Sequence, residues 1–353
     1  MGMRTSGLRC FAAAALFAAA VNACATCAAF ADEGGVSFWL PGLFGSLAAT
    51  PQQPGWAATS IYYHTTVSAS GDVSLSREFE IHGIPLTASA HANANLNATG
   101  DLGIFVPSYV FATPFLGGQA AVSMMTIYGN TSTSLAGTVS GTVRPIPFGP
   151  LSASLSDSTT GFGDLYPTFA VRWNEGVNNF MTYITGDLPV GDYNSSNLAN
   201  IGLGHGAIDG GGGYTYFNPQ TGHEFSGVLG FTYNLMNQST QYQNGVDMHF
   251  DWGASQFLTR QVQVGLVGYV YDQLSCDSGS GDRVGCFESR VAGIGPQIGF
   301  IFPVSGMQGY LNFKGYGEFD AAARPSGWNA WATLVISPAA PIPPTPSRPI
   351  IMK

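Results

Sequence analysis

The sequence predicts an all-β protein, a transmembrane antiparallel up-and-down barrel of about 12 strands, with about 10 to 14 as the range. Three observations lead to this fold: the composition, a secretory N-terminus and segments of alternating polarity. Charged residues make up only 9% of the chain, against about 25% in soluble globular proteins. Glycine accounts for 47 of the 353 residues, and aromatic residues for 12%. An exterior so poor in charge suits lipid better than water.

The N-terminus has the parts of a secretory signal. Two arginines precede an apolar run at Cys10–Val21, and Ala29–Ala31 matches a small-residue cleavage site. We therefore expect residues 1–31 to be a cleaved signal peptide that sends the chain through the inner membrane to the bacterial outer membrane. The apolar run is too short for a membrane-spanning helix, which needs about 20 residues. Lipoprotein processing at Cys24 is the alternative.

Residues 32–54 precede the first expected strand and do not alternate in polarity. This part of the chain contains the apolar run Phe38, Trp39 and Leu40. It either enters the barrel as a plug or clasps the rim from outside, and both arrangements remain open at this point. If it enters the barrel, Phe38, Trp39 and Leu40 would offer an apolar patch to a ring-shaped solute, because apolar walls are typical of ligand sites.

Residues 55–337 are expected to form the barrel. The clearest strand is Val246–Trp252, in which the even-numbered side chains are apolar and Asp247, His249 and Asp251 alternate with them. Side chains alternate faces along a strand. A soluble sandwich would bury the apolar face, whereas a membrane barrel would turn it to lipid and the polar face to the lumen.

The remaining expected strands are roughly 9 to 14 residues long. One of them, Leu86–Ala98, is small and polar on both faces and is expected to rise above the membrane. These strands lie at Thr59–Val67, Leu86–Ala98, Leu102–Ala112, Ala120–Tyr128, Asp164–Trp173, Phe180–Leu188, Gly210–Asn218, Gly227–Leu235, Val262–Tyr271, Ser289–Phe302, Gln308–Phe319 and Trp328–Ile336. Ser132–Thr160, rich in Ser, Thr, Gly and Pro, is expected to be a long outer loop. Residues 338–353 are proline-rich and are expected to form an extended tail outside the barrel.

Few residues in the sequence suggest a metal-binding or catalytic site. The lumen-facing candidates by alternation are Arg172, Asp247, His249, Asp251, Lys314 and Glu318. Alternate residues of one strand lie about 6.5–7 Å apart, so the Asp-His-Asp face cannot hold a metal without help from other strands. No nucleophile motif is present. We therefore expect no metal, no cofactor and no enzymatic activity.

Two cysteines follow the signal region. Cys276 and Cys286 flank a Ser-, Gly- and Asp-rich segment, and an oxidising compartment favours a local disulfide between them. Two free thiols are the alternative.

Several motifs resemble those of one family. The segments SRVAGIGPQIGF, MQGYLNFKGYGEFD and RPSGWNAW within Ser289–Pro338, together with Ser37–Ala49, Gly161–Pro167 and Thr185–Tyr193, are similar to the MetA-pathway phenol-degradation family of outer-membrane proteins. The resemblance implies an outer-membrane barrel of a kind often described as a transporter of aromatic or other hydrophobic compounds. Membership of that family is commonly assigned from gene context, so the substrate does not carry over.

The function expected from all of this is an outer-membrane channel, porin-like and monomeric, for passive uptake of small hydrophobic compounds, aromatic ones among them. Its partners would be outer-membrane lipid and the solute. Nucleic acid is excluded because the chain has 12 basic against 21 acidic residues and lacks a basic patch. The alternatives are a structural or surface-interaction barrel with a sealed lumen, and a barrel-embedded lipid hydrolase.

Overall fold

The computed structural model describes residues 37–81, 84–143, 146–282, 286 and 288–339. The expected signal peptide, residues 32–36 and all but the first two residues of the expected tail lie outside these ranges. Within the described part of the chain, no helix has both the length and the apolarity needed to cross a membrane.

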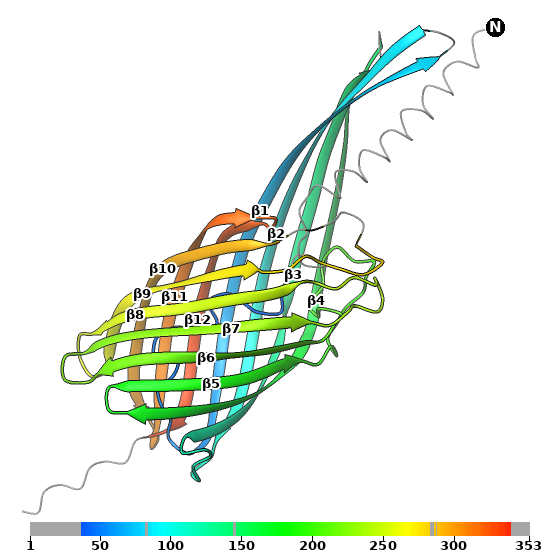
Figure 1. The fold of residues 1–353 in the computed structure, drawn as a ribbon. Helices are drawn as coiled ribbons and strands as arrows, with labels where there is room; N and C mark the ends of the chain where they lie inside the picture. The colour runs from blue at the N-terminus through cyan, green and yellow to red at the C-terminus, as the bar shows by residue number, and fades with distance from the viewer. Residues whose placement is uncertain (1–36, 82–83, 144–145, 283–285, 287, 340–353) are drawn as a thin grey trace, which may run out of the picture.

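Twelve antiparallel strands close into one barrel, in which each strand pairs with the next and β1 pairs with β12 (Figure 1). The predicted barrel and its strand number are confirmed. The strands are β1 (Gly55–Ile81), β2 (Ile84–Val110), β3 (Gln119–Val143), β4 (Ile146–Glu175), β5 (Asn178–Asp187), β6 (Ala207–Asn218), β7 (His223–Asn234), β8 (Val246–Phe257), β9 (Val262–Gln273), β10 (Arg290–Val304), β11 (Met307–Ala322) and β12 (Ser326–Pro338).

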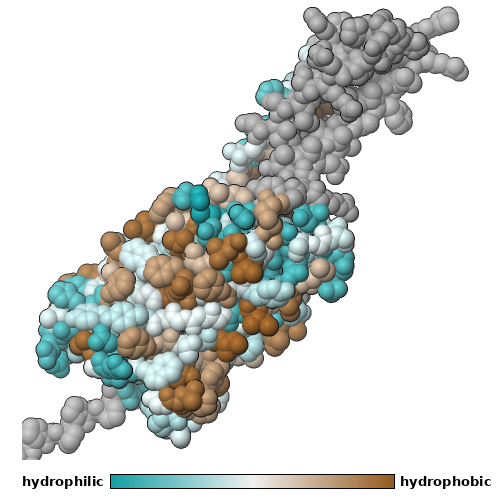
Figure 2. Space-filling view, in the orientation of Figure 1, coloured by the Kyte–Doolittle hydropathy of each residue, from teal (hydrophilic) through white to brown (hydrophobic). Residues whose placement is uncertain are grey.

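Polarity in the barrel wall is the reverse of that in a soluble protein. In β7, Phe231 and Tyr233 are 47% and 53% exposed, while Thr232 between them is 1% exposed. In β8, Asp247, His249 and Asp251 are buried and their apolar neighbours face outward. On the visible wall of strands, apolar side chains lie among weakly polar ones, and the most hydrophilic side chains gather towards the barrel ends (Figure 2). This is the distribution that surrounding lipid requires.

The two ends of the barrel differ in their connections. The end where β1 begins, called here the turn end, has connections at 111–118, 176–177, 219–222, 258–261 and 305–306. The opposite end, called here the loop end, has the longer connections at 188–206, 235–245 and 274–289. Short turns at one end and long loops at the other are typical of outer-membrane barrels, in which the long loops face outward.

Strands β1–β4 continue far beyond the rest of the barrel at the loop end (Figure 1). The pairing of β1 with β12 ends at Ser68–Ser326, and beyond it β1 pairs only with β2. The expected long loop at Ser132–Thr160 is therefore wrong, because β3 and β4 pair along this stretch from Asn130–Thr160 to Val143–Ile146. Backbone hydrogen bonds build a ladder without apolar side chains, so a polar strand away from lipid looks like a loop in the sequence.

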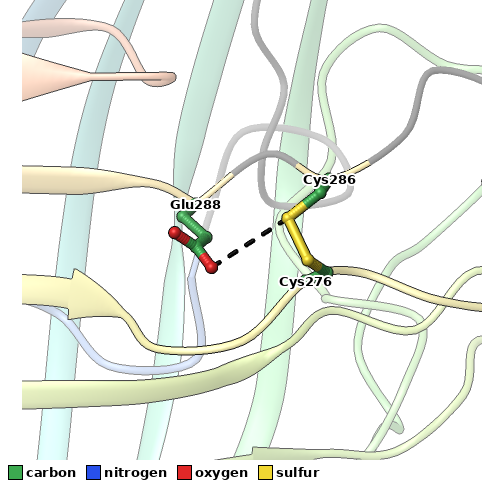
Figure 3. Close-up of side chains that lie close together, drawn as sticks. All are labelled: Cys276, Cys286 and Glu288. Carbon is green, nitrogen blue, oxygen red and sulfur yellow. Dashed lines mark hydrogen bonds between the residues drawn. A yellow bond between two sulfur atoms is a disulfide. The ribbon is translucent and has the colours of Figure 1, made fainter.

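The predicted disulfide is confirmed: Cys276 and Cys286 are bonded in the β9–β10 loop, beside Glu288 (Figure 3). These three residues form a compact group of potential metal ligands, but the sulfurs are bonded to each other and offer no thiolate. Next to the bond, Asp277 Oδ1 accepts hydrogen bonds from Gly245 N at 3.0 Å and Gln273 Nε2 at 2.7 Å. The braced loop is thereby tied to the β7–β8 loop.

Replacing both cysteines with serine should loosen this loop without opening the barrel, since the bond lies outside the strand ladders. We expect amide hydrogen exchange at residues 274–282 to rise at least about tenfold, while the refolded protein keeps its heat-resistant compact migration on a gel. Loss of that compact form in the double variant would show instead that barrel closure depends on the bond.

Candidate functional site

Residues 37–54, called here the lumen segment, lie inside the barrel. Phe38 and Trp39 are buried, and Ala49 N donates a hydrogen bond to the inward-facing Thr215 Oγ1 at 3.0 Å. Near the turn end, Gln52 N donates to Gln119 Oε1 at 2.7 Å. Of the two arrangements left open by the sequence, the structure therefore has the plug and not the clasp on the rim.

Two buried charges hold the middle of the lumen segment. Asp251 accepts hydrogen bonds from Gly42 N at 2.9 Å and Phe44 N at 3.0 Å. From the other side, Lys314 Nζ donates to the carbonyl oxygens of Gly42, Leu43 and Phe44. A segment outside any strand has backbone groups without ladder partners, and burying them unpaired is costly. Asp251 and Lys314 supply those partners.

Gly42 is required by this arrangement. Its φ is +88°, a conformation that L side chains rarely adopt, and a Cβ here would lie 2.9 Å from the ring of Tyr316. Glycine lets the chain turn tightly against Tyr316 while its amide reaches Asp251 and its carbonyl reaches Lys314.

Trp39 is fixed from two directions. Its indole Nε1 donates to Asp251 Oδ2 at 3.3 Å, and its ring stacks on His249 with 3.7 Å between centroids and 11° between planes. His249 Nε2 lies 2.9 Å from Asp209 Oδ2. The Asp209–His249 pair is buried in the wall and forms the platform for the Trp39 ring.

Towards the turn end, polar side chains hold the rest of the lumen segment. Leu47 N donates to Glu224 Oε1 at 2.9 Å, and Gln297 Nε2 donates to Ser46 Oγ at 2.6 Å. With Thr215, Asp251 and Lys314, these partners all belong to β6–β11. The lumen segment is therefore docked on one half of the wall.

A cavity of about 320 Å³, called here the turn-end cavity, lies between the lumen segment and the other half of the wall, β1–β5. Its lining is mostly apolar. The aromatic and larger aliphatic residues around it are Phe38, Trp39, Leu40, Leu43, Phe44, Leu47, Ile61, Val106, Met125, Tyr166, Met181 and Tyr183. Such a lining suits a compact apolar solute.

A second cavity of about 150 Å³, called here the loop-end cavity, lies further toward the loops. It is lined by Tyr63, Val67, Leu96 and Leu102 from β1 and β2, and it also reaches the loop residues 198–200. Trp39 and Leu40 line both cavities. These two side chains therefore stand at the boundary between the cavities.

On the outer face of β1–β5, an apolar depression backs onto the turn-end cavity. It is lined by residues that include Trp56, Pro107, Met124, Pro167 and Phe169. Four residues line both hollows and form the wall between them: Ser108, Ser123, Thr168 and Thr185. The wall is thin here because these four side chains are small.

The strand ladder is also interrupted at this wall. The β2–β3 register stops at Phe105–Thr126 and resumes at Ser108–Ser123, which skips Pro107. The continuous β4–β5 register begins at Thr168–Thr185, just after Pro167. Proline has no N–H to donate to a ladder and is unusual in central strands. Pro107 and Pro167 thus each lie beside a gap in one of their two ladders, as Pro296 does between β10 and β11.

The remaining three lumen-facing candidates predicted from the sequence lie apart from one another. Asp247 Oδ2 accepts a hydrogen bond from Asn234 Nδ2 at 2.8 Å in the wall. Glu318 lines the loop-end cavity and accepts from Tyr269 Oη at 2.7 Å. Arg172 lines the turn-end cavity. The structure thus brings Asp251, His249 and Lys314 together around the lumen segment and leaves the other three apart.

Sequence reasoning missed two carboxylates of the site, Asp209 and Glu224. Both occupy inward positions of alternating strands, Asp209 in β6 and Glu224 in β7. The same period-two test that selected β8 would have selected Glu224, whose neighbours His223 and Phe225 are exposed. Asp209 precedes four glycines, which carry no side chain and hide the alternation.

Comparison with known proteins identifies the family. The family model described as "Putative MetA-pathway of phenol degradation" matches residues 85–334. The chain belongs to this family. The resemblance expected from the motifs is thereby confirmed. No curated protein matches the chain.

Among solved structures, the chain is similar in fold to the COG4313 outer membrane channel from Pseudomonas putida F1. The TM-score is 0.58 at 12% identity, with 82% of this chain and 97% of the channel covered. A FadL homologue from Pseudomonas aeruginosa matches with a TM-score of 0.38 at 7% identity over 87% of this chain and 94% of that one. The first likeness supports the barrel fold, and the second is too weak to carry an argument.

Replacing Asp251 with alanine should release the lumen segment. The change removes the acceptor for Gly42 and Phe44 and leaves the buried Lys314 without its nearby opposite charge. Leaving a buried hydrogen-bond donor unsatisfied costs about 1–3 kcal/mol for each group. We expect proteolytic cleavage within residues 37–54 to become at least about a hundredfold faster.

Glu175→Ala is the matched control, since Glu175 is an exposed carboxylate at the turn end, and it should behave as the wild type. An Asp251→Ala protein with wild-type cleavage would show that Asp251 does not hold the segment.

Proposed function

We propose that the protein is a channel of the bacterial outer membrane through which small hydrophobic compounds cross by diffusion. The apolar outer face of the strands supports the membrane setting, and the family and the fold of the Pseudomonas putida channel point the same way. No energy-coupling motif was found in the sequence, so passage would follow the concentration gradient. The proposal includes no enzymatic step.

The turn-end cavity is the observation that carries this proposal. A barrel serving only as a scaffold would fill its lumen with side chains, as small barrels do. Here the lumen segment covers the β6–β11 half, and about 320 Å³ of mostly apolar space remains beside β1–β5. Ligand sites for small molecules range from about 300 to 1,000 Å³, so the space suits one small solute at a time.

The thin wall supports a route for such a solute. Moving a hydrophobic compound from lipid into water is unfavourable, whereas it can exchange between lipid and an apolar cavity at small cost. The wall of Ser108, Ser123, Thr168 and Thr185, with its two prolines, separates the turn-end cavity from the lipid-facing depression. We propose that this stretch of β2–β5 parts to let the solute pass sideways.

A second candidate is the surface-interaction barrel with a sealed lumen. The four-stranded projection of β1–β4 and the side chains that fix the lumen segment favour it. It requires no solute in the turn-end cavity, whereas the channel requires one. Transport measurements therefore separate the two functions.

If the protein is the proposed channel, toluene should enter vesicles that carry the refolded protein and have lipopolysaccharide in the outer leaflet, whereas a disaccharide should enter little. The apolar lining of the turn-end cavity gives the physical reason for the preference. Protein-free vesicles supply the baseline for each solute. Toluene flux equal to that baseline, from a barrel that migrates as folded, would favour the sealed-lumen function.

Replacing Trp39 with alanine should reduce selectivity in the same assay. The change joins the two cavities and removes an apolar side chain from both, so disaccharide flux should rise and the toluene-to-disaccharide ratio should fall at least about threefold. Trp328→Ala is the matched control, because Trp328 is 49% exposed on the outer face. Equal ratios in the two variants would remove Trp39 from the barrier.

A further inference from the structure

The turn-end cavity has one charged residue in its lining. Among the described residues that surround it, Arg172 carries a positive charge and no Asp or Glu is present. The other polar groups include the neutral side chains of Gln52, Thr59, Ser108, Ser123, Tyr166, Thr168, Tyr183 and Thr185. A guanidinium stays protonated in proteins, so the cavity carries an uncompensated positive charge.

Arg172 is poorly satisfied by the protein. Its Nε lies 3.4 Å from Ala48 O, and this distance is beyond the usual range of about 2.7–3.2 Å for N–H···O hydrogen bonds. Within the described part of the chain, no carboxylate lies within 4.0 Å of its guanidinium nitrogens. The buried cation Lys314, by contrast, reaches three carbonyl oxygens. Most of the donor capacity of Arg172 is therefore free for a ligand.

The cavity is also polarised along its length. Arg172 lies three residues before the end of β4, and Gln52 lies at the turn end of the lumen segment. Tyr183 lies on the neighbouring β5, opposite Ala170 and so two residues along the strand from Arg172, and it packs against Phe44 and Trp39 with 5.6 and 6.2 Å between ring centroids. One end of the cavity thus presents a cation, and the other presents aromatic rings.

A charge next to an apolar cavity is costly unless it is paired. The planar fork of arginine matches the two oxygens of a carboxylate, and such charge-assisted pairs are among the stronger hydrogen bonds. A solute with an apolar body and one carboxylate would satisfy Arg172 and fill the aromatic end at the same time. A neutral hydrocarbon would leave the guanidinium unpaired, and an ammonium would be repelled by it.

We propose that the turn-end cavity is a binding site for small apolar monocarboxylates, with the carboxylate on Arg172 and the single-ring or short-chain body against the aromatic residues around Trp39. This inference deepens the proposed function and rests on it. It names the charge of the solute as well as its apolarity. It also assigns Arg172 the role of discriminating among apolar solutes.

The test compares three solutes of one shape and different charge: 3-phenylpropionate, 3-phenylpropanol and 3-phenylpropylammonium. Binding to the refolded full-length protein in detergent is measured by calorimetry at pH 8, with each value corrected for partition into protein-free micelles. We expect the carboxylate to bind at least about tenfold more tightly than the alcohol, as one charge-assisted hydrogen bond allows, and the ammonium to bind most weakly.

Arg172→Gln should remove the preference for the carboxylate over the alcohol, and Arg172→Lys should reduce it, because lysine keeps the charge but loses the fork. Arg260→Gln is the matched control, since Arg260 is exposed at the turn end, and it should keep the full preference. Arg172→Lys decides the role of the residue if Arg172→Gln does not refold.

Equal affinity of the wild type for the carboxylate and the alcohol, or binding of neither, would overturn the carboxylate site. A preference that persists in Arg172→Gln would overturn the role of Arg172. None of these results tests the proposed channel function, because toluene flux into vesicles is measured separately. Absent toluene flux together with selective carboxylate binding would overturn the channel and leave a binding barrel.

Discussion

The arrangement of the lumen depends on one constraint: a chain that enters a barrel without joining a strand must find other partners for its backbone. Residues 37–54 find them in side chains that point inward from β6–β11. Asp251 accepts the amides of Gly42 and Phe44 while Lys314 donates to the carbonyls of the same turn. Most of these partners lie on one half of the wall, although Gln52 binds Gln119 of β3 and Ala48 O accepts from Arg172 of β4. Most of the segment therefore lies against that half, and the open space is left beside β1–β5.

The strand ladders of the two halves can be compared in the same way. The half that holds the lumen segment has continuous ladders from β6 to β10, with one gap at Pro296 between β10 and β11, and it carries most of the buried polar groups of the described residues. The half that faces the turn-end cavity contains Pro107 and Pro167, with gaps in the register beside both. Proline is disfavoured in a ladder that only needs to be stable. Its presence in two central strands, next to a cavity and a lipid-facing depression, fits a wall that serves passage.

The sequence predicted the barrel because period-two alternation is a strong signal wherever one face meets lipid and the other meets polar groups. It failed at Ser132–Thr160, where β3 and β4 leave the barrel and both faces become polar, so that the alternation disappears while the backbone ladder continues. The aromatic run of the lumen segment could be recognised in the sequence. Its location inside the barrel could not be predicted, because contacts such as the stacking of Trp39 on His249 join residues far apart in the chain. Arg172 was found by alternation alone, and its lack of a carboxylate partner needed the three-dimensional arrangement.

Burial of Asp251 and Lys314 has a consequence for the environments in which the protein can work. Dissolved ions screen charges at a surface over about 10 Å at 0.1 M salt, but they screen buried charges much less. Asp251 is 1% exposed and Lys314 is 9% exposed, so ions have little access to the contacts that keep the lumen segment in place. A cell that moves between dilute and saline water would therefore keep the same lumen in both.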